Sequence, residues 1–105
     1  MERYGYTFEL STKYDSRKSF YGKAKVEETE DGEAILYSYG RKVAAALRGA
    51  VTLFSGVSMS GSQTTTRHIV EFVKQYGNVD LWEDAKLGGQ KFLRKYEAAG
   101  VIEVI

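Results

Sequence analysis

Apolar and polar residues alternate in two stretches near the start of the chain, and a period of two predicts β-strands with one buried face. The first stretch has its apolar positions at Tyr4, Tyr6, Phe8 and Leu10. The second runs from Phe20 to Val26, and the apolar run from Ala34 to Tyr39 is predicted to be the returning strand. Between these two, Asp31-Gly32 supplies the left-handed pair that tight hairpin loops need, so they are predicted to form a β-hairpin.

The next stretch, Val43 to Leu47, is rich in alanine, which favours a helix. It is only five residues long, however, and Gly40 and Gly49 bracket it before the β-prone run from Val51 to Phe54. Length and the flanking glycines favour two short strands joined at Arg48-Gly49. A short helix over Val43 to Leu47 is the alternative.

The pattern changes period after a Gly and Ser loop from Ser55 to Gln63. Between Thr64 and Tyr76 the spacing predicts a helix. Its apolar stripe is Ile69, Phe72, Val73 and Tyr76, and the residues predicted to face away are Arg67, Glu71, Lys74 and Gln75. Ser62, Thr64 or Thr65 can cap the start, and Gly77 suits a left-handed position at the end.

A second helical region begins at Asp80, where the spacing to Glu83 matches a capping box. Gly88-Gly89 is predicted to interrupt it and Gly100 to end it, and Val101 to Ile105 is predicted to add an edge strand. The predicted fold is a single α+β domain over residues 1–105. Its antiparallel sheet comes from the N-terminal half, and two or three helices pack on one face.

Composition excludes several classes of protein. The chain has 105 residues, no cysteine, one histidine and a formal net charge of +1. A disulfide framework and a thiolate metal site are excluded, and one histidine gives a metal little to bind, so no metal and no cofactor are expected. Apolar runs fall short of the roughly 18 residues that span a bilayer, and the first residues lack a signal-peptide core. We therefore expect a cytoplasmic protein with no membrane partner.

Catalytic motifs are incomplete. The segment from Gly56 to Gly61 has the glycine spacing of a phosphate-binding loop, but Ser62-Gln63 stands where the lysine and hydroxyl should follow. His68 has no accompanying nucleophile motif, so a structural role for its ring is favoured. The sequence therefore predicts a protein that is not an enzyme.

Charge is segregated along the chain. Positions 34 to 70 contain no carboxylate, while five acids crowd the predicted hairpin tip: Glu27, Glu28, Glu30, Asp31 and Glu33. The carboxylate-free segment holds the candidate binding residues Tyr37, Tyr39, Arg41, Lys42, Thr65, Thr66, Arg67 and His68.

Two interpretations of these candidates stay open. Both tyrosines are expected on one face beside the cations, where they could stack on bases, or else packed under the helices. The Thr64 to His68 stretch could form an anion site at a helix start. Alternatively, a hydroxyl caps the helix and Arg67 pairs with Glu71.

Two segments carry a family resemblance. Tyr37-Ser38-Tyr39-Gly40-Arg41-Lys42-Val43-Ala44, followed by Thr65-Thr66-Arg67-His68-Ile69-Val70-Glu71-Phe72, resembles a group of small phage and mobile-element proteins. The resemblance covers about residues 19 to 76. It implies a phage-type accessory protein, a class that includes anti-CRISPR inhibitors of host defence, acting inside the host bacterial cell by binding rather than by turnover.

These observations lead to two hypotheses. The first is a non-enzymatic accessory protein that binds a host protein or nucleoprotein complex, such as a defence nuclease. The alternative is a small nucleic-acid-binding module that uses the basic and aromatic residues. A homodimer through the exposed edges at Tyr4 to Leu10 and Val101 to Ile105 would be compatible with either hypothesis.

Overall fold

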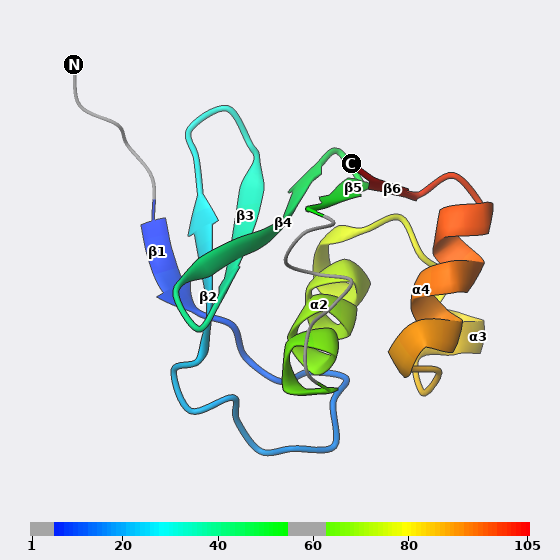
Figure 1. The fold of residues 1–105 in the computed structure, drawn as a ribbon, viewed down its shortest axis with the longest axis horizontal. Coiled ribbons are helices and arrows are strands. Elements are labelled where there is room, and N and C mark those ends of the chain that lie inside the picture. Colours follow the sequence, from blue (N-terminus) through cyan, green and yellow to red (C-terminus); the bar gives the residue numbers. More distant parts are fainter. Residues whose placement is uncertain (1–5, 55–62) are drawn as a thin grey trace.

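A computed structural model describes residues 6–54 and 63–105 as a sheet packed against helices (Figure 1). The strands are β1 (Tyr6–Glu9), β2 (Ala24–Glu28), β3 (Ala34–Ser38), β4 (Arg41–Leu47), β5 (Ala50–Leu53) and β6 (Ile102–Val104). The helices are α2 (Gln63–Tyr76), α3 (Leu81–Asp84) and α4 (Gly89–Ala98). The predictions for Tyr4, for the 55–62 loop and for a cap at Ser62 lie outside the described residues.

The six strands lie in the sheet in chain order, from β1 at one edge to β6 at the other. Neighbours from β1 to β5 pair antiparallel, and β6 pairs parallel with β5 after the helices have carried the chain back. The α+β prediction is confirmed. Both predicted edge strands are at the edges of the sheet.

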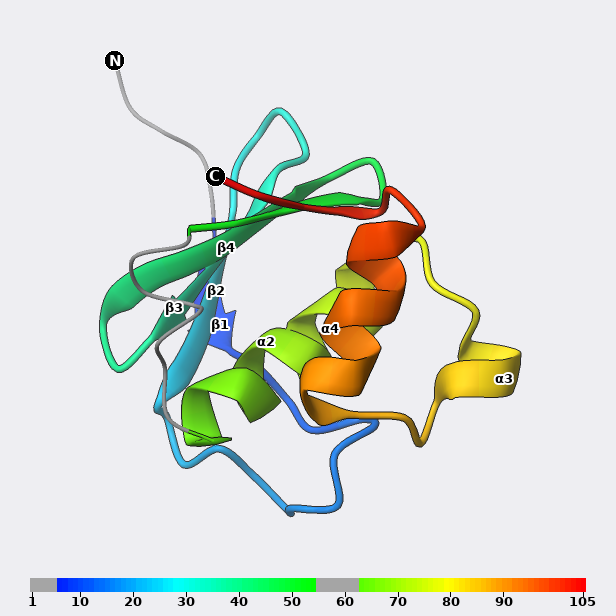
Figure 2. The same cartoon turned by 45° about the vertical axis from the view of Figure 1, so that its right-hand side comes forward.

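The helices cover one face of the sheet. In Figure 2, α2 and α4 lie side by side under the strands while α3 projects outward. α2 packs on β3 and β4, and α4 packs on α2 and β6. The largest fully buried side chains include Leu36, Leu53, Ile69, Phe72 and Phe92, so the core fills the layer between sheet and helices.

Glycine turns set the strand boundaries where the sequence predicts them. Gly32 has a φ of +90°, and the Thr29 N–H donates to the Glu33 carbonyl at 2.9 Å, which confirms the hairpin. The predicted left-handed pair at Asp31-Gly32 is wrong, because among the described residues Asp31 does not have a positive φ. Arg48 and Gly49 both have positive φ and join β4 to β5. Because β4 pairs with a strand on each side, the helical alternative for Val43 to Leu47 is wrong.

The buried face predicted for the first strand is wrong. Tyr6 is 76% and Phe8 38% exposed, and only Leu10, just beyond β1, is buried. Phe8 lies opposite Val26 on the helix side of the sheet. The helices, however, pack on β3, β4 and β6, so this end of the inner face lacks their cover.

The end of α2 also differs from the prediction. Gly77 does not have a positive φ; it forms a bridge with Gly49, and the Asn78 N–H donates to the Gly49 carbonyl at 2.8 Å. A Cβ at Gly77 would lie 2.7 Å from the Val73 carbonyl oxygen. This glycine is therefore required by close backbone approach rather than by a left-handed conformation.

The helices after Gly77 follow the predicted signals. Asp80 caps α3 by accepting the N–H groups of Trp82 and Glu83 at 3.0 and 3.2 Å. The Asp80 N–H donates to the Tyr96 hydroxyl rather than to Glu83, which ties α3 to α4. Among the described residues, none of the helices has the length and apolar character that crossing a membrane requires.

Candidate functional site

Two Tyr-Gly pairs form left-handed turns. Tyr21 and Gly22 have φ values of +54° and +76°, and Tyr39 and Gly40 have values of +53° and +80°. Two successive residues of positive φ define a type I′ turn, in which asparagine and glycine are the usual residues. A tyrosine in this region costs on the order of 1–2 kcal/mol. We call these two pairs the tyrosine turns.

The tyrosine turns lie next to each other at one end of the sheet (Figure 1). The Tyr39 N–H donates to the Lys23 carbonyl at 2.8 Å, and Ala24 pairs with Ser38 in the adjoining strands. Tyr21 is 73% exposed and Tyr39 53% exposed. Two exposed aromatic side chains are therefore held on neighbouring turns.

A buried polar cluster supports the second turn. His68 is fully buried, and its Nδ1 lies 2.8 Å from the Ser38 hydroxyl, which lies 3.2 Å from the Thr65 hydroxyl. The His68 ring packs between Phe20, at 4.5 Å between ring centroids, and Tyr39, at 5.7 Å. His68 and Thr65 therefore support the turn from below rather than facing a partner.

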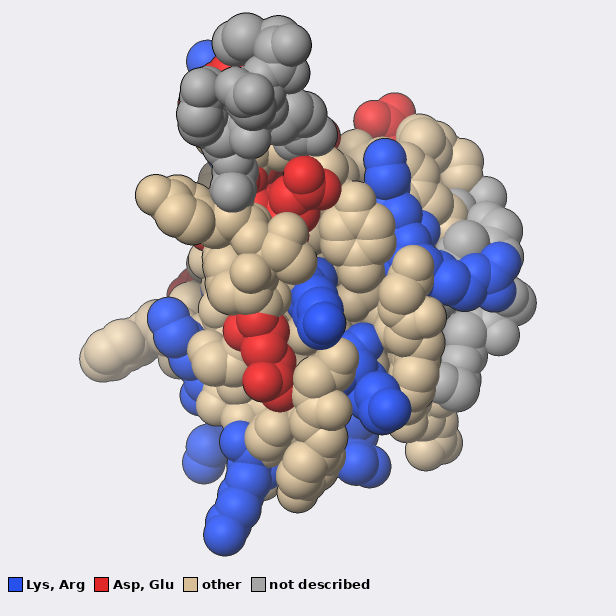
Figure 3. Space-filling view, turned by 90° about the vertical axis from the view of Figure 1, so that its left-hand side faces the viewer, with Lys and Arg blue, Asp and Glu red and all other residues tan. Residues whose placement is uncertain are grey.

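Cations outnumber acids near the tyrosine turns. Residues 11–25 and 39–42, which we call the basic end, carry seven exposed cations and one carboxylate: Lys13, Arg17, Lys18, Lys23, Lys25, Arg41 and Lys42, against Asp15. A second carboxylate, Glu9, lies opposite Lys25 in β1 and accepts the Gly22 N–H at 2.6 Å. Figure 3 shows Lys and Arg side chains along the lower part of this side of the molecule. Since Asp15 is paired with Arg67, the exposed charge of the basic end is positive even with Glu9 beside it.

The structure separates the two predicted tyrosines. The Ser38 side chain points to His68 in the layer under the sheet, so its strand neighbour Tyr37 points to the open face, where its hydroxyl donates to Glu27 at 3.0 Å. Tyr39 lies beyond the end of β3 with its ring against His68. The expectation that both rings share one face is wrong, because Tyr39 belongs to a turn and not to the strand.

The other predicted binding residues are divided between different environments. Arg41 and Lys42 are exposed at the basic end, and the Lys42 ammonium lies 5.7 Å from the Phe54 ring centroid. Thr65 is buried and Thr66 half-buried. The predicted Arg67 to Glu71 pair is wrong, because Arg67 donates to Asp15 at 3.0 Å.

Glu71 and Lys74 do not face solvent as predicted. The 11–19 loop folds over this side of α2, and the Glu71 carboxylate accepts the N–H groups of Lys13, Tyr14 and Asp15 at 2.8 to 3.2 Å. Lys74 is 5% exposed and donates to the Ala85 carbonyl at 2.7 Å. The polar side of α2 is therefore the surface that anchors the loop.

The tip of the acidic hairpin, Glu27 to Glu33, lies at the opposite end of β2 and β3 from the tyrosine turns, although Lys25 of the basic end is only two residues from Glu27 in β2. Glu28 accepts the Tyr76 hydroxyl at 2.9 Å, and burial, together with this bond, raises the pKa of Tyr76. Glu30 and Asp31 are exposed.

Sequence reasoning missed most of the basic end. Five of its cations lie in residues 11–25 beside a single acid, a charge bias that was visible in the sequence. Tyr21-Gly22 repeats the Tyr39-Gly40 pair, which was a second available signal. Within the described ranges, no three His, Asp or Glu side chains gather closely enough to hold a metal ion.

Searches of curated proteins and of solved structures found no match to this chain. A sequence model of one protein family matches residues 8–89, a range that includes the tyrosine turns, the acidic hairpin and all of α2. The chain therefore belongs to this family, DUF8033, a family of unknown function.

Proposed function

We propose that this protein binds single-stranded nucleic acid at the basic end and acts without turnover. The observation that carries the proposal is the pair of exposed tyrosines held in left-handed turns among exposed cations. Aromatic rings stack on bases and Lys and Arg contact phosphates, which is how sequence-tolerant single-strand binding works. Strained backbone that a more suitable residue would relieve is typical of functional positions.

Replacement of the turn tyrosines tests the proposal. Tyr21→Asn places a residue that suits the left-handed region, so the free energy of unfolding should be unchanged or slightly higher. Loss of a stacking ring should weaken binding of a labelled single-stranded oligonucleotide by about tenfold or more, measured by fluorescence anisotropy at low salt. Tyr39→Asn should weaken binding in the same way.

Arg48→Asn is the matched control, because Arg48 also precedes a glycine in a left-handed turn, but at the end of the sheet near the acidic hairpin. The affinity of Arg48→Asn for the oligonucleotide should fall much less than that of Tyr21→Asn. Equal losses in the two variants, or no oligonucleotide binding by the wild type at low salt, would exclude the proposal.

A second candidate function rests on the acidic hairpin. We infer that its carboxylates could mimic nucleic-acid phosphates toward a host defence nuclease inside the bacterial cell, as the resemblance to phage accessory proteins suggests. Exposed Glu30 and Asp31 at the tip favour this candidate. Phage challenge of bacteria with defined CRISPR systems tests it. Lower immunity with the wild type, restored by Glu30→Lys, would support it, and unchanged immunity across the systems would exclude it.

A further inference from the structure

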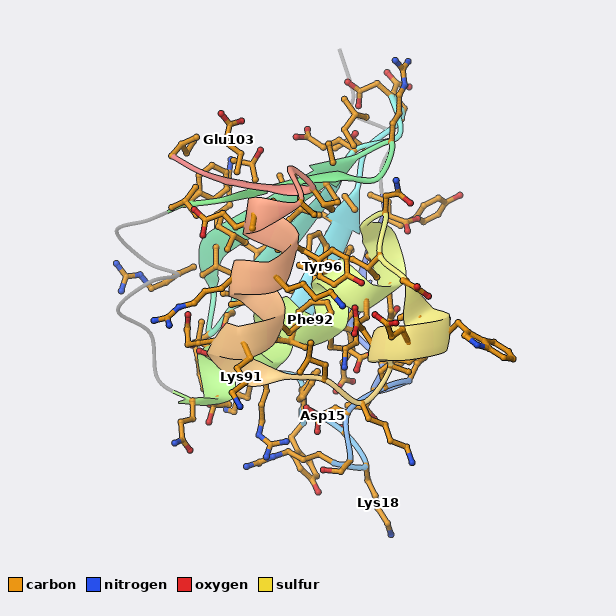
Figure 4. All side chains as sticks on the ribbon, turned by 90° about the vertical axis from the view of Figure 1, so that its right-hand side faces the viewer. Asp15, Lys18, Lys91, Phe92, Tyr96 and Glu103 are labelled. Atoms are coloured by element: carbon orange, nitrogen blue, oxygen red, sulfur yellow. The ribbon has the colours of Figure 1, made fainter. Side chains whose placement is uncertain are left out.

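A cavity of about 800 Å³ lies apart from the tyrosine turns, between α2, the 14–16 loop and the connection from α3 to α4. Figure 4 shows Asp15 beneath Phe92 and near this connection. Cavities that hold small molecules typically measure about 300–1,000 Å³. The size therefore suits a small molecule, and the lining determines which kind.

The two carboxylates that line the cavity already have partners. Glu71 accepts the three loop N–H groups and, in addition, the Gln75 side-chain amide at 2.6 Å. Asp15 accepts Arg67 at 3.0 Å and the Arg17 N–H at 2.8 Å. Their negative charge is compensated within the protein, so the acids are poorly placed to bind a cation.

Hydrogen-bond donors in the lining are less fully used. The Lys74 ammonium has three protons; it donates to Ala85 and lies 5.2 Å from the Phe92 ring centroid, with no other hydrogen-bond partner among the described residues. Burial lowers the pKa of Lys74, against opposing contributions from Glu71 and two aspartates. Exposed Lys86 adds a second cation to the lining.

The start of α4 adds backbone donors. Gly88, Gly89 and Gln90 line the cavity. The N-cap residue of α4 is Gly88, which has no side chain to cap the first N–H groups of the helix. The first amides of a helix carry unpaired N–H groups and partial positive charge. Together with Lys74 and Lys86, they give the cavity an excess of donors over free acceptors.

We propose that this cavity binds a small anion with a phosphate or carboxylate group. Lys74 would contact the anion from below and Lys86 from the rim, and the first amides of α4 would donate to its oxygens. Residues 14–16 of the lining belong to the basic end, but the tyrosine turns lie outside the lining, so loss of the stacking rings separates this proposal from nucleic-acid binding.

Nuclear magnetic resonance titrations of the full chain with pyrophosphate and with citrate, at constant ionic strength, test the proposal. Saturable shifts of the Gly88 and Gly89 amides with either probe are expected, and the tighter probe identifies the preferred group. Gln90→Glu places a carboxylate in the cavity and should weaken binding by about tenfold or more. Lys74→Met should abolish the shifts.

Two surface variants keep the test independent of folding. Lys86 lines the cavity and Lys91 does not, and both are exposed. Lys86→Gln should therefore weaken anion binding, while Lys91→Gln should leave the affinity for the anion unchanged. Tyr21→Asn should also leave it unchanged, which separates this site from the proposed nucleic-acid surface. Equal effects of Lys86→Gln and Lys91→Gln, or no saturable shift with either probe, would overturn the proposal.

Discussion

His68 is held neutral by its surroundings. The ring is fully buried between Phe20 and Tyr39, and Nε2 has no hydrogen-bond partner among the described residues. Burial lowers the pKa of His68 from 6.5 to about 4, although Asp15 opposes the shift. Between about pH 4 and pH 6.5, His68 is therefore mostly neutral in the folded protein and mostly protonated in the unfolded chain.

This difference predicts a loss of stability in mild acid. As pH falls below 6.5 the unfolded chain binds the proton first, so the stability that His68 contributes is complete above about pH 6.5 and is lost toward pH 4. Between pH 7 and pH 5 the loss should be about 2 kcal/mol. Urea unfolding followed by circular dichroism measures it, since the single tryptophan, Trp82, is exposed and a poor reporter.

His68→Gln is the reference for this prediction, because glutamine does not titrate in this range. The variant should be less stable at pH 7 but should lose about 2 kcal/mol less than the wild type on going to pH 5. Identical pH dependence in the two proteins would show that other groups cause the acid sensitivity.

The same residues show where local patterns stop being informative. The helical spacing correctly predicts that Ile69, Phe72 and Val73 face the core. It also predicts that Glu71 is exposed. This is wrong because a loop 56 to 58 positions earlier in the sequence folds over the polar side of the helix, and a local pattern carries no information about such a contact. Tertiary contacts of this kind bury polar residues without changing the sequence pattern.

At the scale of elements, the contact between the end of α2 and the β4–β5 turn determines how the helix sits on the sheet. Gly77→Ala should place a Cβ 2.7 Å from a backbone oxygen that cannot move aside, and 3.2 Å from Val51. We expect a loss of about 1–3 kcal/mol in the free energy of unfolding. Urea denaturation measures this loss.

Gly88→Ala is the matched control for this substitution. The site has an extended φ of −144°, and nothing lies within 4 Å of the position that the alanine Cβ would take, so the change should stay within about 0.5 kcal/mol. If the two variants had the same denaturation midpoint, the close approach at Gly77 would not be the constraint on this junction.

Most elements were predictable from the residues that favour turns, since a glycine in each tight turn marks where the strands reverse. The two strands around Arg48-Gly49 and the hairpin at Asp31-Gly32 follow directly from it. The exposure of β1 does not, because alternation shows that a strand has two different faces but not whether a helix covers one of them. The parallel pairing of β6 likewise depends on the path through three helices.

At the scale of the whole molecule, a formal net charge of +1 conceals two ends of opposite sign. β2 and β3 separate the hairpin tip from the tyrosine turns, while Lys25 lies two residues from Glu27 on the same face of β2. Such a distribution orients a charged partner as it approaches, and it makes affinity at the basic end sensitive to salt.

If the protein binds single strands as we propose, the salt dependence of binding reports which cations contact phosphates. For a single strand, each phosphate contact contributes about 0.7 to the slope of log affinity against log salt. If Arg41 contacts a phosphate, Arg41→Gln should reduce the magnitude of the slope by about 0.7. Arg48→Gln removes the same charge near the acidic hairpin and should leave the slope unchanged. Equal reductions would mean that overall charge, rather than the basic end, governs binding.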